Sequence, residues 1–251
     1  MTVLLSVVDL RKAFGGVKAV DGVSFELARG ELLALIGPNG AGKSTCFNMI
    51  NGQLRPDSGR LLLEGRDVTG LKPRDIWRLG VGRTFQVAAT YGSMTVIENV
   101  QMALLSHHRQ LYRFWPRMRA LHREQALELL AAVGLQDQAD AACSTLAYGD
   151  IKTVELAIAL ANSPRLLLMD EPTAGMAPRE RNALMSLTKR LVKERNIAVL
   201  FTEHSMDVVF AQADRIMVLA RGQLIAQGAP QAIRDNLKVR EVYFGSGKLA
   251  A

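Results

Sequence analysis

The stretch Gly-Pro-Asn-Gly-Ala-Gly-Lys-Ser-Thr at residues 37–45 decides how the rest of the chain is interpreted. It fits the phosphate-binding P-loop pattern G-x-x-x-x-G-K-[ST]. An apolar run at 32–36 precedes it and a helix-compatible segment at 43–50 follows it, as the motif requires. A glycine-rich turn that only starts a helix is the alternative, which the agreement of strand, loop, Lys-Ser pair and helix disfavours. The stretch therefore predicts binding of a nucleoside triphosphate.

The residue types in this stretch each have a chemical reason. Glycines let the backbone turn tightly and bring N–H groups close to phosphate oxygens, and the following helix directs its positive end at the same anion. We expect Lys43 to add a full charge at the β- and γ-phosphates and the Ser44 hydroxyl to ligate Mg²⁺. The predicted nucleotide-binding set from the loop is Gly37, Pro38, Asn39, Gly40, Ala41, Gly42, Lys43, Ser44 and Thr45.

Size and composition allow one large domain or two small ones. The chain has 251 residues, and 49% are apolar, enough for a sizeable core. No apolar stretch approaches the ~20 residues that cross a bilayer. Asp9, Arg11 and Lys12 interrupt the N-terminus, so no secretory signal is predicted. We expect the chain to stay in the cytoplasm unless a partner holds it at a membrane. The two cysteines, Cys46 and Cys143, suggest neither a disulfide nor a zinc framework.

The formal net charge of +7 suggests an anionic partner, such as a nucleotide, a nucleic acid or a membrane surface. Part of the excess lies in residues 107–123, where five arginines alternate with three aromatic residues. An exposed, arginine-rich helical surface is the simplest interpretation. Contact with anionic lipid headgroups or a membrane partner, and contact with nucleic acid, stay open.

The order of the expected elements predicts an α/β protein. The first part is β-rich, with strands at 3–10, 17–20 and 23–27, a turn at Asp21-Gly22, a further strand at 59–64 and a short helix at 73–79. Residues from about 95 to 162 are expected to be helical, including a helix from Pro116 through Val133 that Gly134 stops.

Alternating strands and helices return from residue 165, with strands at 166–169 and 197–202 and helices at 178–194 and 205–213. A hairpin at 215–226 and a last helix near 230–235 precede a Gly-Ser-Gly tail that we expect to be loose. This rhythm predicts a mainly parallel core sheet covered by helices, with an antiparallel β subdomain and an inserted helical subdomain.

A second set of chemical residues follows expected strands. Asp170 ends an apolar strand at the sheet edge where ligands bind, so we expect it to support Mg²⁺. The next residue, Glu171, can take a proton from water or orient it for attack, although an Asp-Glu pair can also be a solvated turn. His204 follows the next strand, as either a γ-phosphate contact or a satisfied polar residue. Gln86 ends a strand at 82–86 and is either a magnesium or water ligand or a solvated amide.

Two further features bear on the nucleotide. Leu146, Ala147, Tyr148, Gly149 and Asp150 open a helix, and Gly149 would let backbone N–H groups approach an anion. It is not obvious that one chain could bring this helix to its own P-loop, which suggests a second subunit. Phe14 lies in a glycine-flanked loop, as either a core residue or a stacking surface for a base.

These motifs resemble, in order and spacing, those of the ATP-binding subunits of ABC transporters, over residues 3 to 245. Residues 37–45 match the Walker A motif, 166–170 Walker B and 146–150 the signature motif. By the same resemblance Gln86 is the Q-loop glutamine, Glu171 the catalytic glutamate, His204 the switch histidine and Phe14 the adenine-stacking aromatic. It implies a single domain, with a nucleotide-binding core at 3–94 and 163–228, a helical subdomain at about 95–162, and a C-terminal helix and tail at 229–251.

The resemblance also implies a mechanism and partners. Two ATP-binding subunits, identical or paralogous, would pack head to tail and hold each ATP between one P-loop and the other signature helix. Ser44, Gln86 and Asp170 would hold Mg²⁺, Lys43 would neutralise phosphate charge, and Glu171 and His204 would serve hydrolysis. Two integral membrane permease subunits would dock a helix in the groove around Gln86, and a solute-binding protein would act indirectly. The chain would then be peripheral, on the cytoplasmic face of the inner membrane.

Within that family the sequence looks most like the larger ATPase of branched-chain amino acid importers. This likeness rests on Gly82–Gln86, Met94–Val100, the Tyr-Gly-Asp variant of the signature, Asp170–Met176, and the ending near Val239–Gly245. It implies ATP hydrolysis that powers import of branched-chain amino acids or related small solutes. Another transport system, including an exporter, stays open.

Four residues depart from the family pattern. Ala147 replaces the usual signature serine, Tyr148 the first glycine and Asp150 the glutamine, while Ala177 lies where aspartate or asparagine is common. Backbone donors near Gly149 remain, so we expect an active site with altered coupling between the two ATPs.

Two other classes compete with a transport function. A nucleic-acid-directed ABC ATPase would suit the positive charge, but the chain has one ATP-binding core and no long heptad run. A P-loop GTPase or kinase would need no signature helix, and the guanine-reading Asn-Lys-x-Asp motif is absent from the sequence.

Overall fold

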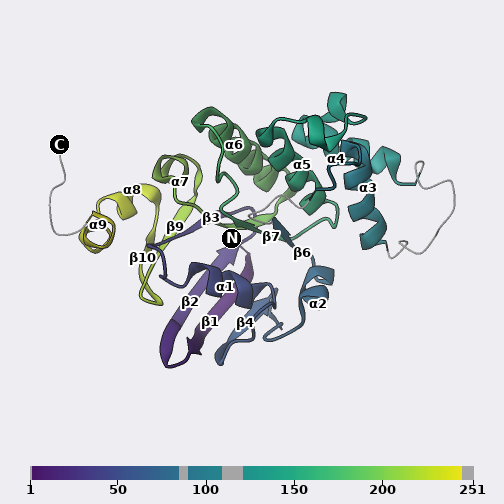
Figure 1. Ribbon diagram of the computed structural model, residues 1–251. Helices are drawn as coiled ribbons and strands as arrows, with labels where there is room; N and C mark the ends of the chain where they lie inside the picture. The colour runs from purple at the N-terminus through teal and green to yellow at the C-terminus, as the bar shows by residue number, and fades with distance from the viewer. Residues whose placement is uncertain (1, 85–89, 109–120, 245–251) are drawn as a thin grey trace.

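The computed structural model describes residues 2–84, 90–108 and 121–244, and of Phe244 only the backbone. Gln86 and most of the basic stretch at 107–123 therefore lie outside the described residues. Figure 1 shows most of the helices above a central sheet, and a second sheet with further helices below it.

The central sheet has six strands in the order β10-β9-β3-β8-β7-β6. The five strands from β9 to β6 run parallel, and only β10 is antiparallel to its neighbour. This confirms the predicted mainly parallel sheet. The strand bounds are β3 Leu32–Ile36, β6 Val81–Thr84, β7 Leu166–Asp170, β8 Ala198–Thr202, β9 Arg215–Ala220 and β10 Gln223–Gly228.

Strand β3 shows why the middle of this sheet consists of apolar runs. All five of its residues are buried. Because side chains alternate between the two faces of a strand, Leu33 and Leu35 join one apolar cluster, and Leu32, Ala34 and Ile36 join another. A strand that is covered on both faces has no position left for a polar residue.

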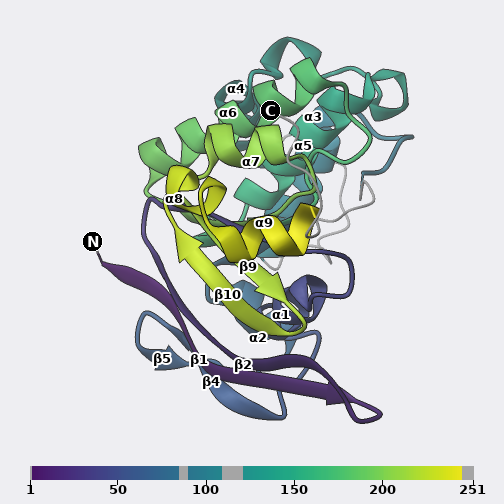
Figure 2. The ribbon, with the colours of Figure 1, turned by 90° about the vertical axis from the view of Figure 1, so that its left-hand side faces the viewer.

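The second sheet is antiparallel, in the order β2-β1-β4-β5, and it lies below the central sheet in Figure 2. Its strands are β1 Val3–Phe14, β2 Val17–Ala28, β4 Ser58–Leu63 and β5 Arg66–Asp67. Helix α1, Lys43–Ile50, shares an apolar cluster with this sheet and with the Leu33 face of β3. The helix that leaves the P-loop is thus held between two sheets.

The predicted turn at Asp21-Gly22 is wrong. Residues 17–28 form one strand, and the chain reverses at Gly15-Gly16 instead. Distant groups keep Asp21 within the strand, because its N–H donates to Gly222 O at 2.8 Å and its carboxylate pairs with Arg11 and Lys18. Residues Asp21 and Gly22 lie at an irregularity in the β1–β2 register rather than at the end of a hairpin.

The described residues of the predicted helical region form three helices: α3 Val96–His107, α4 Arg123–Val133 and α5 Tyr148–Leu160. Short 3₁₀ turns at Gln136–Gln138 and Cys143–Thr145 connect α4 with α5. Gly134 ends α4 in the left-handed region, as predicted. A continuous helix from Pro116 through Val133 is wrong, because Leu121 and His122 form a turn in which His122 has φ 56°, a value that no α-helix contains. Pro116 itself lies outside the described residues.

Mutation can test the capping of helix α3 at its N-terminus. Thr95 and Glu98 form a capping box, in which the Thr95 N–H donates to Glu98 Oε2 at 2.9 Å and the Glu98 N–H donates to Thr95 Oγ1 at 3.3 Å. We expect Thr95→Ala to lower the free energy of unfolding by about 1 kcal/mol, since it leaves a helix N–H unsatisfied. Urea denaturation measures this. Ser106→Ala, at the exposed end of the same helix, should cost nothing, and equal losses in the two variants would contradict the assignment.

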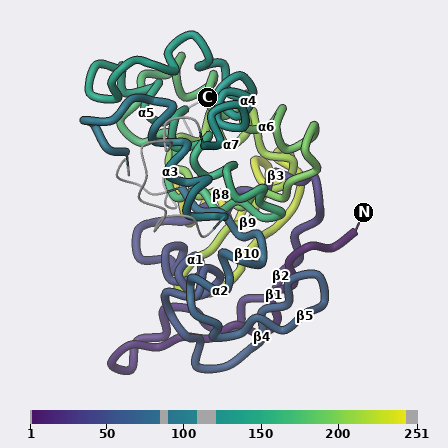
Figure 3. Tube along the Cα trace, turned by 90° about the vertical axis from the view of Figure 1, so that its right-hand side faces the viewer, coloured from purple at the N-terminus to yellow at the C-terminus, as the bar shows by residue number. Residues whose placement is uncertain are grey.

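The remaining helices are α2 Pro73–Arg78, α6 Pro178–Arg195, α7 Met206–Gln212, α8 Pro230–Arg234 and α9 Leu237–Phe244. Among them, α6 and α7 pack on the face of the central sheet that Leu32, Ala34 and Ile36 line, whereas α2, α8 and α9 lie beside its edge strands β6 and β10. The sequence interpretation did not anticipate α9, which Val239 and Tyr243, one helical turn apart, hold on the core. Figure 3 views the molecule from the right-hand side of Figure 1. It shows α3, α4 and α5 above the central sheet and β1, β2, β4 and β5 below it. In the part of the chain that the structure describes, no helix has the length and apolar character to span a bilayer.

Candidate active site

The candidate site lies at one edge of the central sheet. The parallel strands β3, β7 and β8 all end there, and their carboxyl ends lead to the P-loop, to Asp170-Glu171 and to Glu203-His204. Ligands of open α/β sheets bind at this edge. Three stretches that are far apart in the sequence thus meet in one place.

The P-loop is held closely against neighbouring backbone. Gly42 has φ 103°, and a Cβ there would lie 2.3 Å from Ala19 O, so no other residue fits without a shift. Lys43 is buried, and its Nζ donates to Gly37 O at 2.7 Å and to Pro38 O at 3.1 Å. Burial lowers the pKa of Lys43, and the charges of Glu171 and Asp170 oppose this shift. The ammonium group is therefore curled back into the loop and faces both carboxylates.

Two hydrogen bonds orient the Asp170 carboxylate. Thr202 Oγ1 donates to Asp170 Oδ1 at 2.8 Å, and Arg83 Nη2 donates to Asp170 Oδ2 at 3.2 Å. Arg83 also donates through Nη1 to Asn48 Oδ1 at 3.0 Å and to Gln53 Oε1 at 2.9 Å. The sequence analysis assigned no role to Arg83 or Thr202, although both lie next to motifs that it singled out.

Glu171 and His204 are in contact. His204 Nε2 lies 2.9 Å from Glu171 Oε1. Glu171 has φ 47°, which is uncommon for a residue with a side chain, and its N–H donates to Thr202 Oγ1 at 3.0 Å. The unusual backbone turns the Glu171 side chain away from the direction of β7. A carboxylate and an imidazole at the same edge can together accept and hold a proton.

The five residues at 146–150 lie elsewhere. Among the described residues, no hydrogen bond joins them to residues 37–45. Tyr148 is half-exposed, and its ring lies 3.4 Å from the Cβ position of Gly175, in the loop that follows Glu171. Lys152 Nζ lies 5.7 Å from the centre of the same ring. This part of α5 therefore presents its start to solvent.

Phe14 is not a core residue, because half of its surface is exposed. It ends β1 beside the tight turn into β2, and Lys12 Nζ lies 5.7 Å from its ring centre. β2 in turn reaches the P-loop at Ala19, through the close approach of Gly42. The core alternative is wrong, and the stacking alternative stays a prediction.

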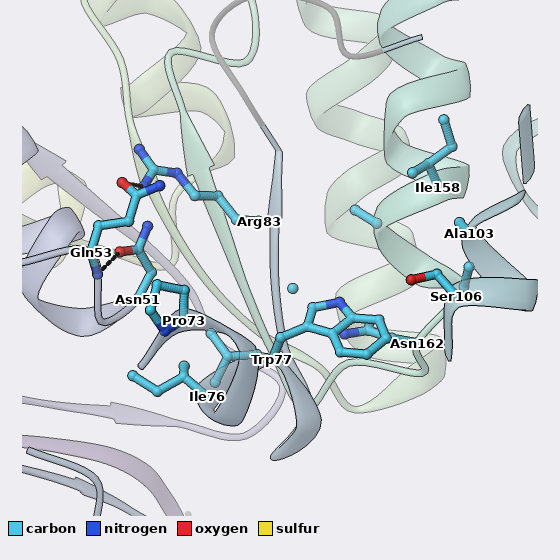
Figure 4. A pocket seen from close by; sticks show the side chains of 14 residues that line it. Asn51, Gln53, Pro73, Ile76, Trp77, Arg83, Ala103, Ser106, Ile158 and Asn162 are labelled. Atoms are coloured by element: carbon cyan, nitrogen blue, oxygen red, sulfur yellow. Dashed lines mark hydrogen bonds between the residues drawn. The ribbon is translucent and has the colours of Figure 1, made fainter. Parts of the chain in front are cut away.

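A pocket of ≈ 310 Å³ opens beside this site, between α2, β6, α3 and α5. Figure 4 shows Trp77 and Ile76 on its floor, Ile158 and Ala103 on the opposite wall, and Arg83 at its inner end. Arg83 thus lines the pocket and bonds Asp170. Gln86 lies outside the described residues, so its predicted place beside this pocket stays a prediction.

Comparisons with known proteins agree with this geometry. Residues 20–174 match the family model described as "ABC transporter", and residues 223–248 match one described as "Branched-chain amino acid ATP-binding cassette transporter". The high-affinity branched-chain amino acid transport ATP-binding protein LivG of Salmonella typhimurium is 39% identical over 252 residues, covering 96% of this chain and 98% of its own. BraF of Pseudomonas aeruginosa, described in the same words, is 38% identical with the same coverage.

Solved structures are similar over the whole length. A nucleotide-free ATP-binding cassette from an ABC transporter has a TM-score of 0.85 at 33% identity, covering 97% of this chain and 100% of its own. A cassette in its ADP conformation has a TM-score of 0.87 at 32% identity, covering 98% and 100%. The family model covers more than half of the chain, and LivG is 39% identical over nearly its whole length, so the chain belongs to the ABC transporters, as an ATP-binding and ATP-hydrolysing subunit.

Proposed function

We propose that this chain powers an importer of branched-chain amino acids or related small solutes. The observation that carries the proposal is the agreement over the full length with LivG and BraF, including the C-terminal segment at 223–248. That segment contains β10 and α8 and the described part of α9, and it matches the branched-chain amino acid model, whereas the general ABC transporter model matches residues 20–174.

The nucleotide of this proposal is ATP with Mg²⁺. The donor set is suitable, because a carboxylate at Asp170 and a hydroxyl at Ser44 are the hard oxygen ligands that Mg²⁺ takes, usually beside phosphate oxygens and water. Hydrogen bonds from Thr202 and Arg83 orient the Asp170 carboxylate. We assign Ser44, Asp170 and Gln86 to the metal. When bound, Mg²⁺ would neutralise charge on the transferring phosphoryl group.

The side chains of this chain divide the remaining work. Lys43 exchanges its two carbonyl partners for phosphate oxygens, which compensate its buried charge better than carbonyl dipoles do. Glu171 takes a proton from the attacking water, and His204 holds the Glu171 carboxylate toward that water. The residues at 37–45 bind the phosphates through backbone N–H groups, and Phe14 stacks on the base.

A second ATP-binding subunit completes each site. The outward start of α5 supports this assignment, because residues 146–150 make no hydrogen bond to their own P-loop and are accessible to another chain. We propose a head-to-tail dimer in which the helical subdomain, about 95–162, presents the first helical turn of α5, which begins at Tyr148, to the partner's ATP. Such a dimer closes because ATP binds the closed state better than the open one. A cassette that is dimeric with ADP and phosphate is similar to this chain, with a TM-score of 0.74 and 26% identity, over 90% of this chain and 99% of its own.

Two integral membrane permease subunits are the other proposed partners, each with a helix in the pocket beside Arg83. The pocket has an apolar floor at Ile76 and Trp77 and a polar end at Arg83, which suits an amphipathic helix end. The chain would then be peripheral, at the cytoplasmic face of the inner membrane. A solute-binding protein would contribute only through the permeases, and nucleic acid is not a proposed partner.

A pull-down from gently solubilised membranes, with this chain as bait and Mg-ATP present, tests the proposal. We expect two polytopic membrane proteins and an ATP-binding subunit, with a solute-binding protein whose bound ligand indicates the substrate class. Recovery of nucleic-acid-associated proteins alone, together with ATPase stimulation by DNA or RNA, would contradict the importer assignment.

A further inference from the structure

Glu203 is a buried carboxylate that receives hydrogen bonds from two loops. Its residue is only 4% exposed. Oε1 accepts from the Thr173 N–H at 2.9 Å and from Thr173 Oγ1 at 2.6 Å, and Oε2 accepts from the His204 N–H at 3.1 Å. In the part of the chain that the structure describes, no lysine, arginine or histidine side chain forms an ion pair with it. A buried carboxylate without a cation is costly, so its hydrogen bonds must hold it.

The two loops are residues 171–177, after β7, and residues 203–205, after β8. Glu203 joins them at Thr173, which is itself 1% exposed. Arg181 joins them a second time, because its Nε donates to Met176 O and its Nη1 donates to Ser205 Oγ, both at 2.7 Å. Glu203 and Arg181 thus connect the two loops at two points. The loops form a single unit, because a movement of one loop relative to the other would break a hydrogen bond.

This unit connects the start of α5 with the contact between Glu171 and His204. At one end, Gly175 of the first loop faces the Tyr148 ring. At the other end, His204 directly follows Glu203, and its ring contacts Glu171 at 2.9 Å. The Tyr148 ring thus lies beside the backbone of the same unit that holds His204 and Glu171, so a displacement of Tyr148 is transmitted through the hydrogen-bonded loops.

A carboxylate is needed at position 203 because both of its oxygens must accept. The Thr173 and His204 backbone groups are both donors and approach different oxygens. Glutamine has nearly the same shape but offers one acceptor oxygen and an NH₂ group, so it can bond one backbone N–H and must face the other with a donor.

We propose that Glu203 is a positioning residue that fixes His204 to the loop at 171–177, so that the start of α5 and the catalytic edge move together. This inference rests on the proposed function, because the connection affects hydrolysis only if the start of α5 contacts a partner's ATP. Each subunit then adjusts its own His204 and Glu171 when its signature turn engages the other nucleotide.

The test compares ATP hydrolysis and ATP affinity of the full-length chain with four substitutions. We expect Glu203→Gln to lower kcat about 10- to 100-fold, as for a lost hydrogen bond to a charged group, with the ATP dissociation constant within about twofold of wild type. Thr173→Val, which loses one donor, should have a smaller effect in the same direction, and Thr173→Ser should restore wild-type kcat. Thr188→Val removes an equally buried hydroxyl that bonds only Leu184 O, and it should leave kcat unchanged.

A double substitution separates positioning from a merely structural role. If Glu203 acts through His204, then Glu203→Gln adds little to the loss already caused by His204→Ala, because both remove the same contact. A structural defect would instead multiply the two losses. A kcat for Glu203→Gln within twofold of wild type, multiplied losses, or parallel loss of ATP affinity would each overturn the inference.

The two levels of proposal fail differently. If the wild-type chain does not hydrolyse ATP, or His204→Ala has no effect, the site assignment itself is wrong. If wild type is active, His204→Ala is impaired and Glu203→Gln is normal, only the role of Glu203 is wrong.

Discussion

Replacing Glu171 by glutamine is expected to slow ATP hydrolysis by about 10²- to 10⁴-fold, the usual contribution of a general base, while ATP still binds. The amide keeps the size of the side chain and its contact with His204, but it cannot take a proton from water. Loss of one negative charge near the γ-phosphate does not weaken binding of an anion. Phosphate release and equilibrium binding of a fluorescent ATP analogue measure the two properties separately.

The matched control for this prediction is Glu194→Gln, which makes the same chemical change on the exposed face of α6. It should hydrolyse ATP at the wild-type rate. We further expect the Glu171→Gln chain to remain dimeric in Mg-ATP on a sizing column, because the ATP that holds the dimer is not consumed. Unchanged turnover in Glu171→Gln would remove Glu171 from the mechanism.

Local sequence patterns were sufficient for the P-loop and most strands. Strands β3, β7 and β8 are apolar runs, because a strand that is buried on both faces has to be apolar. The contact between Glu171 and His204 follows from the same pattern, because Glu171 comes one residue and His204 two residues after parallel strands that proved to be neighbours. Ends of neighbouring parallel strands must meet.

The errors arise where distant residues override a local signal. Asp21-Gly22 has the composition of a hairpin turn, but Gly222 and Arg11 hold it within β2. Arg83 carried no recognisable signal, since its partners Asn48 and Asp170 are 35 and 87 residues away.

Glu203 was missed for the same reason, as its partner Thr173 is 30 residues distant. The one available clue was that Glu203 is a charged residue directly after a buried strand. A buried charge requires partners that the local sequence does not supply. Side-chain networks between loops therefore depend on tertiary structure, whereas the loops themselves can be predicted.

Replacing Lys43 by alanine is expected to weaken ATP binding about 10- to 100-fold and to abolish most hydrolysis. Its Nζ now bonds Gly37 O and Pro38 O, and in the ATP complex it would bond phosphate oxygens. A hydrogen bond to a charged group contributes roughly 1.5–3 kcal/mol, and each 1.4 kcal/mol is about tenfold in the dissociation constant. Unlike Glu171→Gln, this change removes an interaction that is present in both the bound and the transition state.

Separate measurements of ATP affinity and of ATP hydrolysis show whether Lys43 and Glu171 have different roles. Lys238→Ala, on the exposed face of α9, removes the same charge from a side chain outside the phosphate-binding loop and should leave both properties unchanged. The Lys43→Ala chain should also keep its wild-type melting temperature to within a few degrees, because two loop carbonyls regain water when the ammonium leaves. ATP affinity within twofold of wild type would show that backbone N–H groups alone bind the phosphates. The ammonium group would then act only after binding, and Lys43→Ala would resemble Glu171→Gln in every measurement.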